Sequence, residues 1–331
     1  MTQWIALSDQ TGPPPGHCGA LIDRGLFVMD VTPAPDAGEV MLDYQADDGW
    51  ARTFSIFIQR DLGVIILHRQ GRAVMRHALP GPLPAPDGPV RLSFGFDAPA
   101  RQWSVRYESL TTGRHLHASG VNPLPLRLDD LSAICAGRRT IRHPAVRWFG
   151  VTVGDAPPVR ADWIGVNTPI DTPDGPCAAG RLRPGDRVMT EDGPQALHAV
   201  TPHHLPCRGP FAPVLLRAPF HGVRRDLLVS ADQLIALGGP EVEYLFAEDE
   251  VLVPARVVVD QHTAVADRRR HEVSGVSLTL AAPTLLSAAG CGLLSAGNPL
   301  LPLPRRVLDP YEIVPLMALR ARQERRSVGR R

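Results

Sequence analysis

The sequence predicts a mainly β protein built from two domains. Short runs rich in Val, Ile, Phe and Trp recur along the chain, and Gly, Pro and Asp residues separate them. The chain has 331 residues, more than one hydrophobic core usually serves. A Pro-rich polar stretch at residues 154–163 divides two such β-rich regions. These observations together favour two β domains joined by a linker.

The domain limits follow from the same signals. We expect an N-terminal lead at 1–16, a β-sandwich at 17–154, a linker at 155–162, a second all-β domain at 163–303 and a C-terminal helix with a basic tail at 304–331.

In the first domain, strands are expected wherever β-rich runs lie between turn signals. The runs are "TFSIFIQ", "GVIILHR", "VRLSFGF", "WSVRYES" and "VRWFGVTVG". Apolar and polar residues alternate around Leu92, Phe94 and Phe96, which places these three side chains on one face of a strand. Strands at this spacing predict a sandwich or barrel.

Composition excludes several classes of function. Hydrophobic residues make up 44% and charged residues 21%, as in soluble globular proteins. The net charge of +1 gives no general attraction to nucleic acid, so we expect no nucleic-acid partner. The five cysteines include no CxxC pair, which argues against a disulfide framework. No motif calls for a cofactor.

The N-terminus lacks the basic and apolar regions of a cleavable signal peptide. We therefore expect a cytoplasmic protein, or one exported by a route other than Sec. An uncharged run at 273–304 is long enough for a membrane helix, but Pro283, Gly290 and Pro299 interrupt it. Buried strands joined by turns are the prediction for this run, and a membrane anchor is the alternative.

Residues 17–154 resemble the laminin-G/concanavalin A-like jelly-roll family through the stretch "GPVRLSFGFDAPARQWSVRYESLTTGR". The resemblance implies a glycan or a protein surface as partner, bound in some members through Ca²⁺. Trp50 and Trp103 are the candidate ligand-binding residues, and core packing is the alternative for both. The acidic doublets at 47–48 and 129–130 do not supply the 6–8 oxygen ligands that Ca²⁺ takes. We expect solvated turns or a helix cap there and no metal.

The second domain carries four motifs in a fixed order: "NTPIDTPDGP", "LRPGDRVMTEDG", "RRDLLVSADQLIAL" and "EVLVPARVVV". Gly185 and Gly193 lie at expected turns. In this order the motifs resemble a bacterial Hint domain, the fold shared by hedgehog autoprocessing domains and inteins. The resemblance implies self-cleavage, in which a Cys at the start of the domain attacks the preceding carbonyl and a His protonates the leaving nitrogen.

The residues that this chemistry needs are missing from the matching positions. Trp163 stands where the nucleophile is expected, and an indole offers only an N–H donor. Gln233 stands where the His is expected, and an amide does not transfer protons near pH 7. Thr168 and Cys177 are weak alternative nucleophiles. A third position, within 274–290, contains no His, Asp or Cys.

The segment "HAVTPHHLPC" gathers three histidines and Cys207, but its spacing matches no common zinc pattern, and we expect solvated loop histidines. The leading hypothesis is a Hint protein that has lost its self-cleavage centre, leaning away from an enzyme and toward binding or scaffolding. The alternatives are self-cleavage at the Asp162–Trp163 bond, and a glycan- or surface-binding module that the second domain supports.

Overall fold

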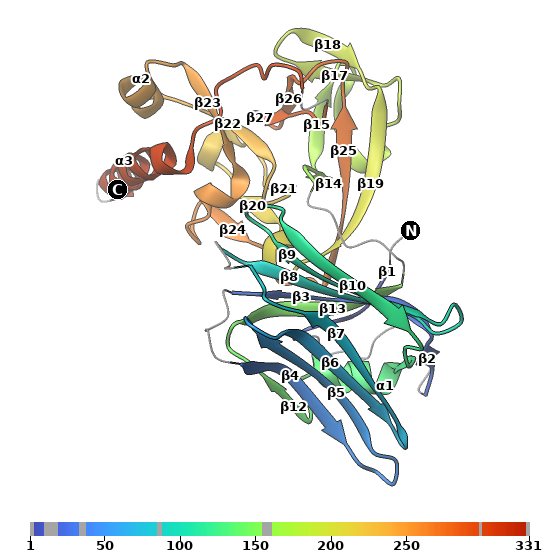
Figure 1. The fold of residues 1–331 in the computed structure, drawn as a ribbon. Helices are drawn as coiled ribbons and strands as arrows, with labels where there is room; N and C mark the ends of the chain where they lie inside the picture. The colour runs from blue at the N-terminus through green and yellow to red at the C-terminus, as the bar shows by residue number, and fades with distance from the viewer. Residues whose placement is uncertain are drawn as a thin grey trace. The chain divides into compact units, whose positions relative to one another are not determined.

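The computed structural model describes residues 3–9, 19–32, 38–84, 88–153, 161–297 and 300–328. The chain folds into two compact units, Met1–Pro158 and Val159–Arg331 (Figure 1). Antiparallel strands dominate both units, so the prediction of a mainly β protein is confirmed.

The first unit is a sandwich of two antiparallel sheets, seen stacked face to face in Figure 1. The six-stranded sheet has the order β1 (Gln3–Leu7), β13 (Val146–Val153), β3 (Arg24–Val31), β8 (Val90–Asp97), β9 (Gln102–Ser109) and β10 (His115–Val121). The five-stranded sheet has the order β12 (Thr140–Arg142), β4 (Glu39–Ala46), β5 (Arg52–Gln59), β6 (Gly63–Gln70) and β7 (Ala73–Pro80). The smaller elements are β2 (Leu21–Ile22), β11 (Leu126–Arg127) and helix α1 (Leu128–Cys135).

The core of the sandwich lies between the two sheets. Phe94 and Phe96 of β8 point into it, as their alternation with polar residues predicts, and both are at most 2% exposed. Phe54 of the five-stranded sheet reaches across to Phe27 and Phe94, with ring centroids 5.3 and 6.4 Å apart. Strand pairing also includes Gln3–Leu7, which the sequence placed in the N-terminal lead.

The second unit contains two more six-stranded sheets. One has the order β19 (Ala199–Pro206), β25 (Glu272–Thr279), β14 (Ile164–Gly165), β21 (Leu227–Val229), β20 (Val214–Leu216) and β24 (Ala264–Ala266). The other has the order β18 (Gly193–Ala196), β17 (Arg187–Thr190), β26 (Leu285–Ala288), β27 (Cys291–Leu294), β22 (Leu234–Gly238) and β23 (Glu250–Pro254). Among its described residues, the unit also contains the hairpin β15 (Pro169–Thr172) and β16 (Gly175–Ala178), helix α2 (Pro240–Phe246), helix α3 (Pro310–Val328) and four short 3-10 helices.

Two local predictions in this unit concern turns and the uncharged run. Gly185 and Gly193 have φ angles of 94° and 97°, which suits glycine at a turn. The run at 273–304 forms β25, β26 and β27. No helix in the described part of the chain is long and apolar enough to cross a bilayer.

Candidate functional site

The peptide bond between Asp162 and Trp163 lies immediately before β14. The indole of Trp163 is only 2% exposed. It lies against Gly275 of β25, where a Cβ atom would come within 2.3 Å of an indole carbon. Glycine at position 275 is therefore what makes room for the ring.

Hydroxyl groups bind both ends of this peptide bond. Ser277 Oγ donates a hydrogen bond to the carbonyl oxygen of Asp162. The amide N–H of Trp163 donates to Ser230 Oγ at 3.3 Å. The N–H of Ser230 donates in return to the carbonyl of Trp163 at 2.8 Å. The carbonyl oxygen and the amide hydrogen of the bond are thus both paired within the protein.

His203 extends the contact at the carbonyl. Its Nε2 lies 2.7 Å from Ser277 Oγ. Burial lowers the pKa of His203, so the ring is neutral at pH 7. Because the hydroxyl hydrogen of Ser277 is directed at Asp162, its oxygen accepts from the Nε2–H group of His203. A chain of hydrogen bonds therefore runs from His203 through Ser277 to the carbonyl oxygen.

The prediction of solvated loop histidines at 198–207 is wrong for His203 and His204, which lie on a strand, whereas His198 is exposed and lies outside the strands, as predicted. Residues 199–206 form β19, which pairs with β25 along its whole length. Pro202 and Pro206 lie within β19, which is an edge strand, where proline is tolerated. The contact between His203 and Ser277 was missed because it depends on the register of two strands that are distant in sequence.

Gln233 lies close to this network without reaching the peptide bond through its side chain. Its backbone N–H donates to Ser230 Oγ at 3.0 Å. Its side-chain amide donates to the carbonyl oxygens of Leu234 and Leu294, at 3.1 and 2.7 Å. The residue is 2% exposed, so the amide is committed to backbone partners in the interior.

The other candidate nucleophiles are engaged elsewhere. Thr168 is buried, and its Oγ1 donates to the carbonyl of Leu228 at 3.1 Å. Cys177 lies in the hairpin of β15 and β16, paired with Ile170. Burial raises the pKa of both Cys207 and Cys291 to about 12, so each stays a thiol at pH 7.

The carboxyl group of Asp162 is unusual in its own right. Burial and the charge of Asp232 together raise its pKa to about 6, while Arg256 opposes the shift. Asp232 and Arg256 form an ion pair with each other. Asp162 therefore remains a poorly solvated acid beside a pair that is already neutralised.

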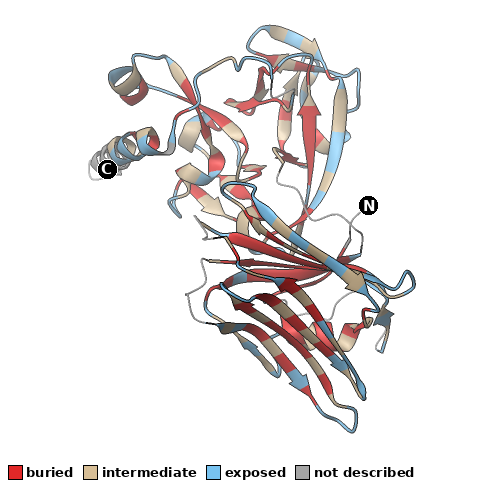
Figure 2. Ribbon diagram, viewed as in Figure 1, coloured by how far each residue is buried: buried red, intermediate tan, exposed pale blue. Residues whose placement is uncertain are grey.

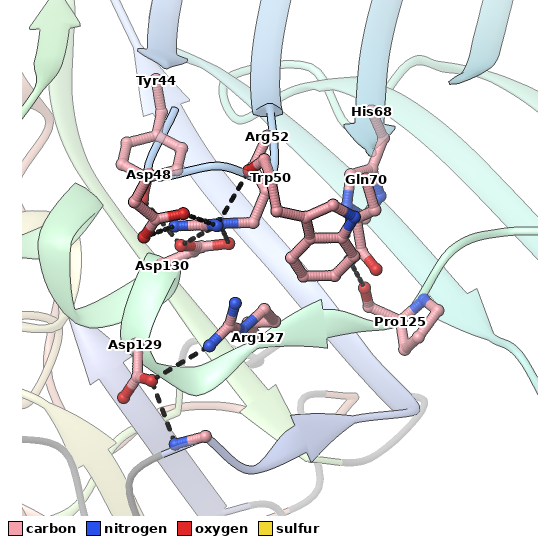
Figure 3. A network of polar contacts seen from close by, with 11 residues as sticks. Tyr44, Asp48, Trp50, Arg52, His68, Gln70, Pro125, Arg127, Asp129 and Asp130 are labelled. Atoms are coloured by element: carbon pink, nitrogen blue, oxygen red, sulfur yellow. Dashed lines mark hydrogen bonds and ion pairs between the residues drawn. The ribbon is translucent and has the colours of Figure 1, made fainter. Parts of the chain in front are cut away.

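In the first unit, Trp50 belongs to the polar network drawn in Figure 3. Its indole is 40% exposed, and the guanidinium carbons of Arg52 and Arg127 lie 5.5 and 5.4 Å from the ring centroid. Gly71 leaves space for the ring, since a Cβ there would lie 2.1 Å from the indole nitrogen.

The prediction of solvated turns or a helix cap does not describe Asp130, which lies in the first turn of α1 but is buried and binds two side chains. Arg52 Nε donates to both oxygens of Asp130 at 3.0 Å, and Tyr44 donates its hydroxyl at 2.7 Å (Figure 3). Arg52 also binds Asp48 and so holds that pKa near 2. One arginine thus joins one acid from each doublet.

Trp103 is separate from this network. It lies on β9, packs against the core of the sandwich and contacts the ring of His77, with centroids 5.0 Å apart. Two tryptophans of the first unit therefore lie in different surroundings and form no shared platform. Across the described residues, no three His, Cys, Asp or Glu side chains gather as a metal site would require.

Residues 165–296 match the family model described as "Hint domain". The second unit contains a Hint domain. The match begins at Gly165, so the Asp162–Trp163 bond lies shortly before the matched residues. No curated protein matches the chain.

Three solved structures are similar to parts of the chain. The CBM40 domain of Ruminococcus gnavus IT-sialidase, bound to α2,3-sialyllactose, is 14% identical over 41% of this chain and 65% of its own, with a TM-score of 0.23. Tailspike protein 2 of bacteriophage CBA120 is 11% identical over 42% and 20%, with a TM-score of 0.24. The LG1–3 region of the laminin α2 chain is 10% identical over 92% and 58%, with a TM-score of 0.27. The chain spans less than two thirds of each, and TM-scores this low support no conclusion about ligands.

Proposed function

We propose that this Hint domain, of the hedgehog/intein type, keeps its fold without self-cleavage. The proposed role of the whole chain is binding or scaffolding, with the first unit engaging a glycan or a protein surface. The observation that carries the proposal is the state of Trp163. Its indole fills the space beside the peptide bond that self-cleavage would break, and it has no atom able to attack a carbonyl.

The commitments of neighbouring groups support the same conclusion. The Gln233 amide binds backbone carbonyls and has no proton to give to a leaving nitrogen at pH 7. The amide N–H of Trp163 is bound by a hydroxyl rather than by an imidazole. An amide bond held in this way lacks both a nucleophile and a general acid.

One experiment tests the loss of self-cleavage. The purified full-length protein is incubated with and without dithiothreitol and hydroxylamine, and its intact mass is measured. We expect one species with the full-length mass under every condition. Fragments that end at Asp162 and begin at Trp163 would overturn the proposal.

A matched variant makes this result informative. The double variant Trp163→Cys/Gln233→His supplies a thiol and an imidazole at the two positions that lack them. We expect dithiothreitol to cleave the double variant at residue 162, about 10²–10⁴-fold faster than Trp163→Cys alone, the usual contribution of a positioned acid. Trp163→Phe is the control and should stay intact.

Self-cleavage at Asp162–Trp163 is the second candidate function, and one observation favours it. The Ser277 hydroxyl, with His203 behind it, donates to the carbonyl oxygen on which negative charge would develop during acyl transfer. The same mass measurement on the unmodified protein decides between the two candidates.

A further inference from the structure

A groove of about 560 Å³ lies on the outer face of the six-stranded sheet in the first unit. Phe94 and Phe96 point into the core, so the residues that alternate with them, Gly95 and Asp97, face outward. The groove crosses β3, β8, β9 and β10. Figure 2 shows that β10 alternates between exposed and half-buried residues, as a strand with one solvated face does.

Gly95 forms the floor of the groove. In the strand register it lies between Leu26 of β3 and Ser104 of β9. A Cβ atom at Gly95 would lie 2.7 Å from Ser104 Oγ. The absence of a side chain at this position therefore opens a hollow on a sheet face that side chains otherwise cover.

Three polar side chains beside this floor have no partner within the described ranges of the chain. Ser104 pairs in register with Ser119 of β10, and Gln102 follows on the same face of β9. Some other polar groups on this face are paired, such as Arg106 with Glu108 at 3.1 Å. Two hydroxyls and a carboxamide together offer several donors and acceptors at short spacing.

The charge of the groove restricts its ligand. Among the described residues that line it, Asp97 alone is charged. Its two oxygens accept from Arg24 Nε at 2.7 Å and from the N–H of Ala100 at 2.8 Å. Among the described residues that line the groove, no cation is available to bind a carboxylate or a sulfate.

We propose that this groove binds a neutral saccharide, an inference that rests on the proposed binding role. Sugar hydroxyls would replace water on Gln102, Ser104 and Ser119. The apolar C–H face of a sugar ring fits over Gly95 and against Val121, which is 64% exposed at the rim. The volume falls within the ~300–1,000 Å³ of ordinary ligand sites.

The test is a glycan array probed with the full-length chain, carrying neutral oligosaccharides beside their sialylated and sulfated forms. We expect neutral glycans to be preferred. The triple variant Gln102→Ala/Ser104→Ala/Ser119→Ala should lose at least tenfold in affinity for the best neutral glycan. Thr53→Ala, on β5 of the other sheet, is the control and should bind as the unmodified chain does.

A second variant separates loss of binding from loss of folding. Ser119 is exposed, so Ser119→Leu should keep the thermal midpoint while its side chain fills the groove and reduces binding at least tenfold. Three results would each contradict saccharide binding in this groove. They are a preference for acidic glycans, unchanged binding by these variants, and no binding of any neutral glycan. The intact-mass measurement tests self-cleavage and does not depend on these outcomes. If acidic glycans bind through Trp50 and Arg127 instead, the proposed binding role stands but the groove is not the binding site.

Discussion

The Asp162–Trp163 bond and the groove on the first unit are opposites in their use of polar groups. At the bond, the carbonyl oxygen and the amide hydrogen are paired within the protein, and an indole fills the adjacent space. In the groove, three polar side chains have no hydrogen-bond partner among the residues that the structure describes, and the space beside them is open. Groups committed to one another stabilise a fold, whereas uncommitted groups are available to a ligand.

A glycine lies at the centre of each region, with different consequences. At Gly275 the missing side chain admits the indole of Trp163, and a Cβ would lie 2.3 Å from it. At Gly95 the missing side chain leaves a hollow, and a Cβ would come within 2.7 Å of Ser104 Oγ and at an ordinary 3.6 Å from Leu26 Cδ1. Glycine thus allows dense packing beside the Asp162–Trp163 bond and leaves an open groove on the first unit.

The largest effect on stability is expected from removing the indole beside the Asp162–Trp163 bond. Trp163→Ala removes a side chain that is 2% exposed and leaves a cavity, so we expect a loss of about 3–5 kcal/mol in the unfolding free energy of the second unit. Differential scanning calorimetry measures the loss. A decrease under 1 kcal/mol would mean that the indole is not part of the packed interior. Trp50→Ala, at a half-exposed position in the other unit, is the control.

Acid should destabilise the core behind the groove. Burial lowers the pKa of His77 to about 4, and both of its ring nitrogens are buried without a hydrogen-bond partner in the described structure. Below pH 6.5 the unfolded chain gains a proton that the folded chain refuses, so stability falls as the pH drops from 6.5 toward 4. His68, whose pKa is lowered to about 3, acts in the same direction.

His77→Leu should remove part of this sensitivity. At about 1.4 kcal/mol for each unit of pKa difference, the variant should recover on the order of 2–3 kcal/mol at pH 4 relative to the unmodified protein. The measurement is the thermal midpoint of the first unit between pH 7 and pH 4. Parallel curves for the two proteins would contradict the assignment, and His117→Leu on the exposed face of β10 is the control.

The two glycines allow a direct comparison. Gly275→Ala places a methyl group against a fully packed indole, and overpacking of this kind costs about 1–3 kcal/mol. Gly95→Ala meets a serine hydroxyl that is free to rotate, so a change under about 0.5 kcal/mol is expected. Urea unfolding of both variants checks the difference, and equal losses would show that the groove floor is as tightly packed as the bond.

Short-range patterns predicted much of this architecture. Alternation around Phe94 identified the core face of β8, and the order of four motifs indicated the Hint domain that the family model matches. The positions that match the family's catalytic residues directed attention to Trp163 and Gln233, whose backbone N–H groups both donate to Ser230 Oγ. Such features are readable because each depends on neighbours in the sequence.

Contacts between distant strands were not readable in this way. His203 meets Ser277 only because β19 and β25 pair in one register, and Arg52 meets Asp130 across 78 positions. The groove depends on Gly95, Ser104 and Ser119 lying side by side on three strands. A sequence shows which face a residue occupies, but the register that aligns those faces is set by the whole sheet.

The remaining effect concerns the carboxyl group of Asp162, whose pH dependence has the opposite sign to that of His77. The pKa of Asp162 is raised to about 6 from an ordinary value of 3.8. Between these values the folded chain holds a proton that the unfolded chain has released, so stability falls as the pH rises from 3.8 through 6. Asp162→Asn removes the cost of the buried charge and should stabilise the second unit by about 1–3 kcal/mol at pH 7, with almost no difference at pH 4. Asp186→Asn, at an exposed turn, is the control. A gain in stability that is the same at both pH values would show that the variant acts through packing rather than through the charge of Asp162.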